Sequence, residues 1–277
     1  MDPEVGHTVG IAATETLSLR ISVATLVKVL FKNPDDGEWL LALERKATLG
    51  EMSHAMLVDE IAQPFGGAIR ILNLTGLHSL VGNFHFDSDR SRSESDFRLF
   101  IQPSHWPAWR AFCIEHLNRA VDSILETDPG RELKEELFDA LKIHIIGDQY
   151  ITKPIGLVIE DQPRPTENPS TPGYPTTRIY RIFEATITDP VLAQALMENS
   201  EGISDQALRK RAFEDGQSGG RGRANAVLAL PLTGIMAFYG ELSPRDRNRS
   251  VIFKGHQLDE TVAAVLEGID VPKYQRL

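Results

Sequence analysis

The chain has 277 residues, of which 42% are hydrophobic and one is cysteine, and its formal net charge is −10. This length and composition predict a soluble globular protein of one large domain or two small ones, and they exclude wholesale disorder. The acidic balance excludes a protein that coats nucleic acid non-specifically, although metal ions held by carboxylates could still carry a nucleotide. The lone Cys113 cannot form an internal disulfide, no apolar run reaches the ~18 residues of a spanning helix, and the N-terminus lacks a basic signal region. We therefore expect a cytoplasmic protein with no membrane segment.

The predicted elements begin with a β-hairpin and then mix strands with helices. After a weakly structured lead-in at 1–17, we expect a strand at 21–31, a turn at 33–37, a strand at 38–45, a loop or short helix at 46–58, and a strand at 60–72 interrupted by Gly66 and Gly67. Next come a solvated loop at 87–96, a strand at 96–102 and helices at 106–125 and 129–141. The last part predicts a Pro-rich surface loop at 161–175, a strand at 176–189, a helix at 204–215, a glycine-rich loop at 216–223, a strand at 225–235, a basic loop at 244–249 and a helix at 258–268. Because regular strand-helix-strand alternation is missing, this order predicts an α+β fold or a mixed α/β sandwich.

The segment GRELKEELFDAL at 130–141 predicts a helix with closely spaced ionisable side chains. Three leucines and an alanine form one apolar stripe, while Glu132, Glu135 and Glu136 stand at i, i+3 and i+4 on a neighbouring face. Three carboxylates this close need a cation if they are buried, and a hard divalent metal prefers carboxylate oxygens. A solvated helix face explains the same pattern, because glutamate is a strong helix former.

Two short motifs resemble the Nudix family. The hexapeptide RELKEE at 131–136 matches the R-E-U-x-E-E segment of the Nudix box, where U is aliphatic, and FGG at 65–67 resembles the glycine turn that opens the box. The resemblance implies an α/β fold, namely a Nudix-like α/β/α sandwich with a mixed sheet. It also implies a single domain over 18–277, with a helical insertion at 74–126 and a C-terminal extension.

The resemblance also implies a metal site and its residues. Glu135 and Glu136 would bind Mg²⁺ or Mn²⁺, and Glu132 would be a further ligand or the water-activating base. Arg131 would hold Glu132 in place, and Gly67 would offer its backbone carbonyl to the metal. The catalytic set is then Glu132, Arg131 and Glu136, and the reaction is hydrolysis of a nucleoside diphosphate linked to another group.

The box departs from the family pattern at three points. Asn73 stands where the family has a glutamate, Phe138 stands where it has a glycine, and 57 residues separate Asn73 from Arg131. A long insertion before an intact R-E-L-x-E-E helix resembles the Nudix branch associated with bacterial anti-phage systems built on cyclic-oligonucleotide synthases. Two alternatives stay open beside the hydrolase: a nucleotide-binding sensor without turnover, and a protein-interaction scaffold that keeps only the fold.

Late arginines supply candidate substrate-binding residues. Arg221 and Arg223 lie in the glycine-rich loop and Arg245 in the basic loop, where guanidinium groups and exposed N–H groups suit phosphate. A mobile solvated loop is the alternative. Trp106, Trp109 and Phe112 could stack a base, but aromatic residues at helical spacing are more often core. We expect a nucleotide-derived small molecule as partner, and a homodimer stays open.

Overall fold

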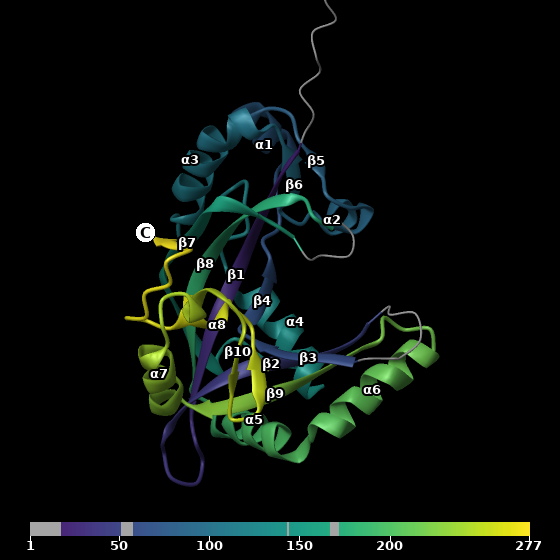
Figure 1. Ribbon diagram of the computed structural model, residues 1–277, viewed down its shortest axis with the longest axis vertical. Helices are drawn as coiled ribbons and strands as arrows, with labels where there is room; N and C mark the ends of the chain where they lie inside the picture. Colours follow the sequence, from purple (N-terminus) through teal and green to yellow (C-terminus); the bar gives the residue numbers. More distant parts are fainter. Residues whose placement is uncertain (1–17, 51–57, 143, 167–171) are drawn as a thin grey trace, which may run out of the picture.

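The computed structural model describes residues 18–50, 58–142, 144–166 and 172–277, so the lead-in predicted at 1–17 lies outside the described residues. One mixed sheet runs through the molecule, and helices lie on both of its faces (Figure 1). The strands are β1 Leu19–Lys32, β2 Trp39–Leu49, β3 Val58–Gln63, β4 Phe65–Ala68, β5 His85–Phe86, β6 Arg98–Ile101, β7 Tyr150–Pro165, β8 Pro175–Ile187, β9 Arg223–Pro231, β10 Val251–Phe253, β11 His256–Leu258 and β12 Gln275–Arg276. The helices are α1 Leu74–Val81, α2 Asp89–Glu94, α3 Trp106–Leu117, α4 Gly130–Leu141, α5 Pro190–Gly202, α6 Asp205–Gln217, α7 Leu232–Glu241 and α8 Val262–Val265, with short 3-10 helices η1 Pro103–His105 and η2 Asp246–Asn248.

The long strand β1 organises the sheet. Parallel β8 follows one edge of β1 from Arg20 to Leu30, while antiparallel β6, β4 and β2 share its other edge in succession. β2 leaves β1 after Ala42 and pairs with β3 from Glu44 onward, and β9 covers the opposite edge of β2. The sheet therefore forks between β4 and β3.

The fork explains a difference from the sequence prediction. The predicted strand at 60–72 breaks at Pro64, between β3 and β4, and not at the two glycines. Proline has no N–H to donate to a sheet, so the chain changes partner strand at this residue. Gly66 and Gly67 lie inside β4, opposite Leu26 and Thr25 of β1.

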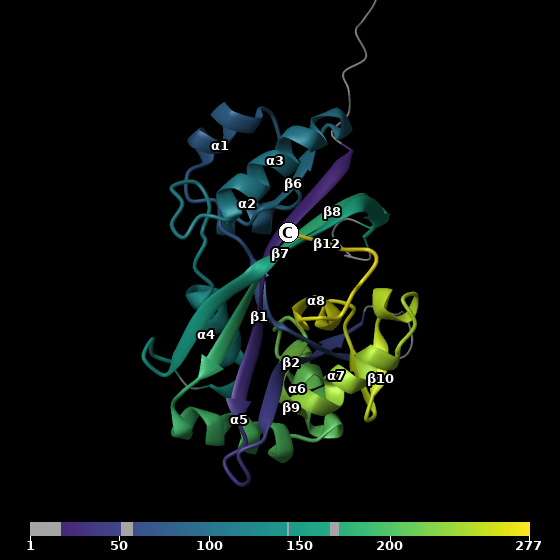
Figure 2. The same ribbon diagram turned by 90° about the vertical axis from the view of Figure 1, so that its left-hand side faces the viewer.

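Side-chain alternation along β1 gives the protein two hydrophobic layers. Val27, Val29 and Phe31 pack with α4 and α5, whereas Leu26 and Leu30 pack with α7 and α8 on the other face. Figure 2 shows α4 and α7 on opposite sides of the sheet. The predicted α/β class, with a mixed sheet between helical layers, is confirmed.

Residues 74–126 form a third cluster over the N-terminal half of β1. Helices α1 and α3 and strand β6 pack around the fully buried Trp109 and the nearly buried Phe112. These two aromatic side chains are therefore core, and they offer no platform to a base. The assignment of this segment as an insertion into a single domain stays a prediction.

The prediction of a solvated loop at 87–96 is wrong, because this segment contains the short helix α2. Its sequence is polar on every face, but Ser88 Oγ accepts the Ser91 N–H at 3.1 Å and caps its first turn. Arg90 and Glu94 form an i, i+4 pair at 3.0 Å along the helix.

The predicted helix at 106–125 is too long, because α3 ends at Leu117. The side chain of Asp122 stops the helix by fixing the turn beyond it. Its Oδ1 accepts the N–H groups of Ile124 and Leu125 at 2.8 and 2.9 Å.

Most of the Pro-rich segment at 161–175 that the structure describes is strand rather than loop. It belongs to the ends of β7 and β8, and the register between them shifts between Glu160 and Arg164. An irregularity of this kind accommodates Pro163 without a missing ladder bond in the middle of the sheet.

The C-terminal third departs furthest from the predicted elements. Helices α5 and α7 are unpredicted, and β9 ends at Pro231 rather than continuing to residue 235. The helix predicted at 258–268 shrinks to α8, because Leu258 pairs in β11 and Asp259 Oδ1 accepts the Thr261 N–H at 2.8 Å. Within the described residues, no helix is long and apolar enough to cross a membrane.

A stability prediction follows from the start of α6. Ser204 Oγ accepts the Ala207 N–H at 3.2 Å and caps this helix. Ser204→Ala should lower the free energy of unfolding by about 1 kcal/mol, and Ser204→Asp, which keeps an acceptor, should retain most of it. Urea unfolding of the three proteins measures the difference. Equal losses in both variants would contradict the capping role.

Candidate active site

The helix α4 begins beside the fork of the sheet. Asp128 Oδ1 accepts the Gly130 N–H at 2.6 Å. The helix begins at Gly130, one residue after the predicted start at Pro129. The apolar stripe faces the sheet, because Leu133 and Leu137 are fully buried among residues of β1 and β4. This packing leaves the glutamates of the helix at the margin of the fork.

Glu132 approaches Gly67 so closely that the two residues form one structural unit. A Cβ atom at Gly67 would overlap the Glu132 carboxylate, with the Glu132 Cδ only 2.7 Å away. Glu132 is 8% exposed. Only glycine at position 67 therefore allows the carboxylate to lie against β4. The Gly67 carbonyl as a metal ligand stays a prediction.

Arg131 lies among three carboxylates. Its guanidinium group contacts Glu126 at 2.6 Å, Glu132 at 2.5 Å and Glu135 at 3.1 Å. It also donates to the Ala68 carbonyl at 3.3 Å, which ties the helix to β4. Burial alone would lower the pKa of Arg131, but the surrounding carboxylates raise it. The guanidinium group therefore stays charged and can hold Glu132 in place.

The three predicted metal-binding glutamates do not share one environment. The Glu135 side chain is 57% exposed and contacts Arg131, whereas that of Glu136 is 19% exposed. Glu136 instead neighbours Glu44 and Lys46 of β2. The structure thus groups Glu136 with Glu44 and Lys46, whereas Glu132 pairs with Arg131 and has only a weak electrostatic effect on Glu136, and Glu135 lies outside this group.

Glu44 is the main functional candidate that the sequence analysis missed. It is fully buried, and its oxygens accept hydrogen bonds from Lys46 at 2.7 Å, Asn225 at 2.8 Å and Gln63 at 3.1 Å. A signal existed, because three ionisable residues, ERK at 44–46, directly follow a buried run in a predicted strand. Its partners come from β9, β3 and α4, and a local pattern does not reveal such pairings.

The carboxyl groups perturb one another's protonation. Burial and the neighbouring Glu44 carboxyl raise the pKa of Glu136 to about 9. Burial also raises the pKa of Glu132, against the opposing effect of Arg131. Burial would lower the pKa of Lys46, but Glu44 and Glu136 outweigh it and raise that pKa. Without a further cation, Glu136 is therefore protonated at neutral pH.

The chemistry of these side chains suits a hard divalent cation, although among the described residues the ligand atoms that gather within 4.8 Å of one another are those of Glu60, Asp205 and His256 and not those of this trio. Glu44, Glu132 and Glu136 offer carboxylate oxygens, which Mg²⁺ and Mn²⁺ prefer. The buried Glu136 Oε2 has no hydrogen-bond partner among the described residues, and Lys46 Nζ lies 3.5 Å from it. Such an oxygen is costly to bury unless it is protonated or bound to a cation.

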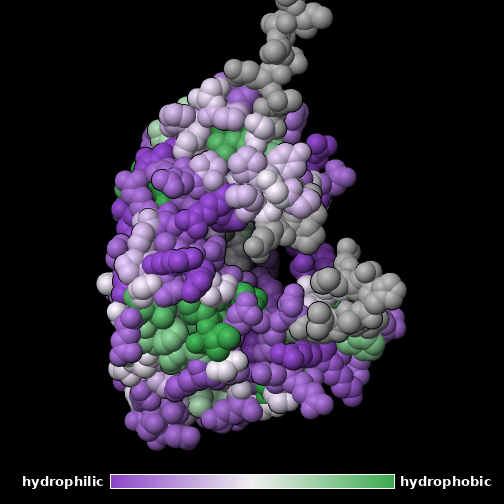
Figure 3. All heavy atoms as spheres, in the orientation of Figure 1, coloured by the Kyte–Doolittle hydropathy of each residue, from purple (hydrophilic) through white to green (hydrophobic). Residues whose placement is uncertain are grey.

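A cavity of about 590 Å³ opens beside Glu136 and brings together side chains from separate elements. In Figure 3 the surface is hollowed between the segment that carries α2 and the arm formed by β2, β3, β9 and α6. Arg90 of α2, Arg211 of α6 and the predicted Arg221 and Arg223 line the cavity together with Glu136. Arg245 does not line it, because it precedes η2 beyond α7. The patch expected from the late arginines therefore forms from two of the three.

Asn73, which stands where the Nudix pattern has a glutamate, caps a helix in this structure. Its Oδ1 accepts the Gly76 N–H at 2.8 Å and caps α1. The residue at the position of the family glutamate therefore starts the added helical segment and does not face the carboxylates of α4.

Another group of possible metal ligands lies on the opposite face of β2. Ligand atoms of Glu60, Asp205 and His256 lie within 4.8 Å of one another. However, Arg45 contacts Glu60 at 3.3 Å and Asp205 at 3.4 Å, and Arg209 contacts Glu60 at 3.4 Å. The two arginines offset only part of this charge, because burial and Asp205 still raise the pKa of Glu60 and its buried Oε2 has no hydrogen-bond partner among the described residues, so this group is a second candidate cation site.

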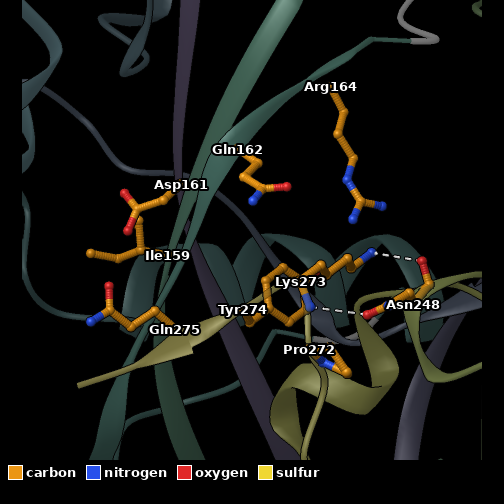
Figure 4. A pocket seen from close by; sticks show the side chains of 9 residues that line it. All are labelled: Ile159, Asp161, Gln162, Arg164, Asn248, Pro272, Lys273, Tyr274 and Gln275. Atoms are coloured by element: carbon orange, nitrogen blue, oxygen red, sulfur yellow. Dashed lines mark hydrogen bonds between the residues drawn. The ribbon is translucent and has the colours of Figure 1, made fainter. Parts of the chain in front are cut away.

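A cavity of about 340 Å³ lies between β7 and the C-terminal segment (Figure 4). Two of its polar lining residues, Lys273 and Asn248, bond each other. Lys273 Nζ donates to the Asn248 carbonyl at 3.2 Å, and Asn248 Oδ1 accepts the Lys273 N–H at 3.1 Å. This cavity is therefore better explained as a packing contact than as a reactive site.

Comparison with known proteins does not assign a family. No family model matches the chain, and no curated protein matches it. A solved structure described as a mutT/nudix family protein from Listeria innocua matches with 11% identity, covering 78% of this chain and 82% of that chain, at a TM-score of 0.30. This likeness is too low to carry an argument about fold or function.

Proposed function

We propose that the protein is a divalent-metal-dependent hydrolase that cleaves a phosphoanhydride bond in a nucleotide or nucleotide-derived compound. The observation that carries the proposal is the buried pair Glu44 and Glu136, with Glu132 nearby, beside a cavity that Arg221 and Arg223 line. Carboxylates can hold a cation, and arginines can bind phosphate oxygens. The Nudix-like motif at 131–136 agrees with this interpretation.

The proposed roles follow from the surroundings of each residue. Glu44, Glu132 and Glu136 would hold Mg²⁺ or Mn²⁺, which when bound supplies charge neutralisation and a more acidic water. Arg131 positions Glu132, the candidate base or third ligand. Arg221 and Arg223 bind the substrate phosphates. Glu136 would have to be ionised to hold the metal, because only the ionised carboxylate is a good ligand.

A second candidate function is nucleotide binding without turnover. Lys46 Nζ lies 2.7 Å from Glu44 Oε2 and 3.5 Å from Glu136 Oε2, so an internal cation partly compensates the pair. If that compensation suffices, the protein holds a nucleotide through its arginines and has no metal. Calorimetry that shows nucleotide binding, together with chromatography that shows no product, would select this candidate.

The proposal is tested with a panel of nucleoside diphosphate and triphosphate compounds. We expect release of phosphate or nucleoside monophosphate that requires Mg²⁺ or Mn²⁺ and stops when the metal is chelated. A panel without metal-dependent products would contradict the hydrolase. The narrower hypotheses, a role in anti-phage nucleotide signalling and a homodimer, stay predictions.

The raised pKa of Glu136 predicts how stability depends on pH. The folded protein keeps a proton on Glu136 up to about pH 9, whereas the same carboxyl in the unfolded chain has its ordinary pKa of 4.5. This contribution is complete below the unfolded pKa and is lost as the pH rises toward 9. The free energy of unfolding of the metal-free protein should therefore fall over this range, by at most ~1.4 kcal/mol per pH unit from this group.

Urea unfolding at several pH values, compared with Glu136→Gln, isolates the effect because other titrating groups are common to both proteins. The difference between the two proteins should grow with pH. A constant difference would show that Glu136 titrates normally. Calorimetry in buffers of different ionisation enthalpy should detect about one proton released when Mn²⁺ binds at neutral pH.

A further inference from the structure

The cavity beside Glu136 carries more positive charge than a metal site requires. Six Lys and Arg residues line it against three Asp and Glu residues. The cations come from β2, α2, α6, the end of α4, the loop before β9 and the first residue of β9, so they surround the space from several sides. A ligand that satisfies them must itself carry several negative charges.

Three of these cations are available to a ligand. Among the described residues, the guanidinium groups of Arg211, Arg221 and Arg223 form no ion pair. Arg90 pairs with Glu94 at 3.0 Å on an exposed helix. The pKa of Glu94 is lowered mainly by its hydrogen bond with Arg90, and the nearby charge of Arg221 lowers it further. The helix α2 and the glycine-rich loop thus face each other across the cavity.

The cavity lacks what a nucleobase needs. Its only apolar lining residues are Ala140 and Ala224, and none of the described lining residues is aromatic. Stacking on aromatic side chains is a main source of affinity for a base, and apolar walls with a few polar groups are usual for small-molecule sites. Trp109 and Phe112 are buried in the core of the segment 74–126 and do not line the cavity.

We infer that this cavity selects its substrate by the number of its phosphate groups and not by its base. The substrate class is a linear polyphosphate of three or more phosphates, free or attached to a nucleoside. The inference rests on the proposed function for the position of the reacting bond beside Glu136. The arginines would bind the oxygens of the phosphate chain, and any nucleoside would extend toward the open side of the cavity.

Calorimetry with inorganic tripolyphosphate as the probe, in metal-free buffer, tests the inference. Tripolyphosphate should bind at least about tenfold more tightly than orthophosphate, since each added charge-assisted contact contributes about this factor. ATP, GTP and UTP should bind within about threefold of one another, and adenosine should not compete. Arg221→Gln and Arg223→Gln should each weaken tripolyphosphate binding about tenfold.

Arg92→Gln is the matched control, because Arg92 lies on the same short helix as Arg90 but does not line the cavity. It should leave binding unchanged. A preference above about tenfold for one nucleobase, competition by adenosine, or tripolyphosphate binding that is insensitive to Arg221→Gln would each overturn the inference. Failure of the proposed hydrolase is a separate result: tripolyphosphate would still bind, but no metal-dependent product would form.

Discussion

Glu136→Gln should abolish metal-dependent turnover while the protein stays folded. The amide is nearly isosteric but is a poor ligand for a hard cation, so Mn²⁺ affinity and the hydrolysis rate should each fall by at least about a hundredfold. In the metal-free protein the substitution removes a carboxyl that burial and Glu44 already keep protonated. Its free energy of unfolding at neutral pH should therefore exceed that of the parent, because the carboxyl of the unfolded parent ionises there and the amide does not. Mn²⁺ titration, nucleotide hydrolysis and urea unfolding measure the three quantities.

Glu198→Gln on the neighbouring helix α5 is the control for this substitution. Glu198 is exposed and accepts one hydrogen bond, from Gln194 at 2.9 Å, so the variant should behave as the parent protein does. Glu135→Gln tests whether the motif or the structure identifies the metal ligands. The family pattern makes both Glu135 and Glu136 ligands, but the Glu135 side chain is 57% exposed. It should cost less than Glu136→Gln. Unchanged activity in Glu136→Gln would show that the metal site is assigned wrongly.

The two adjacent glycines of β4 should respond to alanine in different ways. Gly66 has a φ of +145°, and a Cβ there would overlap the backbone carbonyl of Thr25 in β1. Neither strand can move aside without breaking the ladder, so Gly66→Ala should lower the free energy of unfolding by more than about 3 kcal/mol. At Gly67 the added Cβ meets only the Glu132 carboxylate at the end of a side chain. Gly67→Ala should therefore fold and lose metal affinity, because Glu132 must turn away.

Circular dichroism melting and Mn²⁺ titration of both variants test this contrast. Loss of folding in Gly66→Ala alone, with loss of metal binding in a folded Gly67→Ala, is the expected pattern. A Gly67→Ala protein that binds Mn²⁺ as the parent does would remove Glu132 from the site. The combination Gly67→Ala with Glu132→Asp tests the steric cause, because the shorter carboxylate makes room for the Cβ.

Local features of the sequence were the ones that could be predicted. Helix α4 is an amphipathic segment with its own start signal. Strand β1 and the first half of β2 are largely apolar runs, and β8 alternates polar and apolar residues, so their neighbours are not needed to recognise them. Helix α5 also carried a signal, because Asp189 Oδ1 caps it at Leu192 and Pro190 opens it. Helix α7 carried none, because its sequence LTGIMAFYGE continues an apolar strand without a polar cap.

The candidate site was predictable only in part, because its contacts join distant segments. Glu132 and Glu136 were available from the helix pattern, and Gly67 from the motif. Glu44 was not, because its position depends on where β2 leaves β1 and turns toward β3 and β9. Arg90 was not, because its place in the cavity lining depends on how the segment 74–126 folds and positions α2. Arg221 and Arg223 line the cavity and Arg245 does not, although the sequence placed all three in basic or glycine-rich loops.

A crystal structure of the protein soaked in Mn²⁺ is the sharpest test of the proposed metal site. We expect an anomalous difference peak bound by Glu136 together with Glu132 or Glu44, and Lys46 should then turn away from the bound ion. A peak at Glu60, Asp205 and His256, with none beside Glu136, would refute the proposed site, because the metal would then lie on the other face of β2.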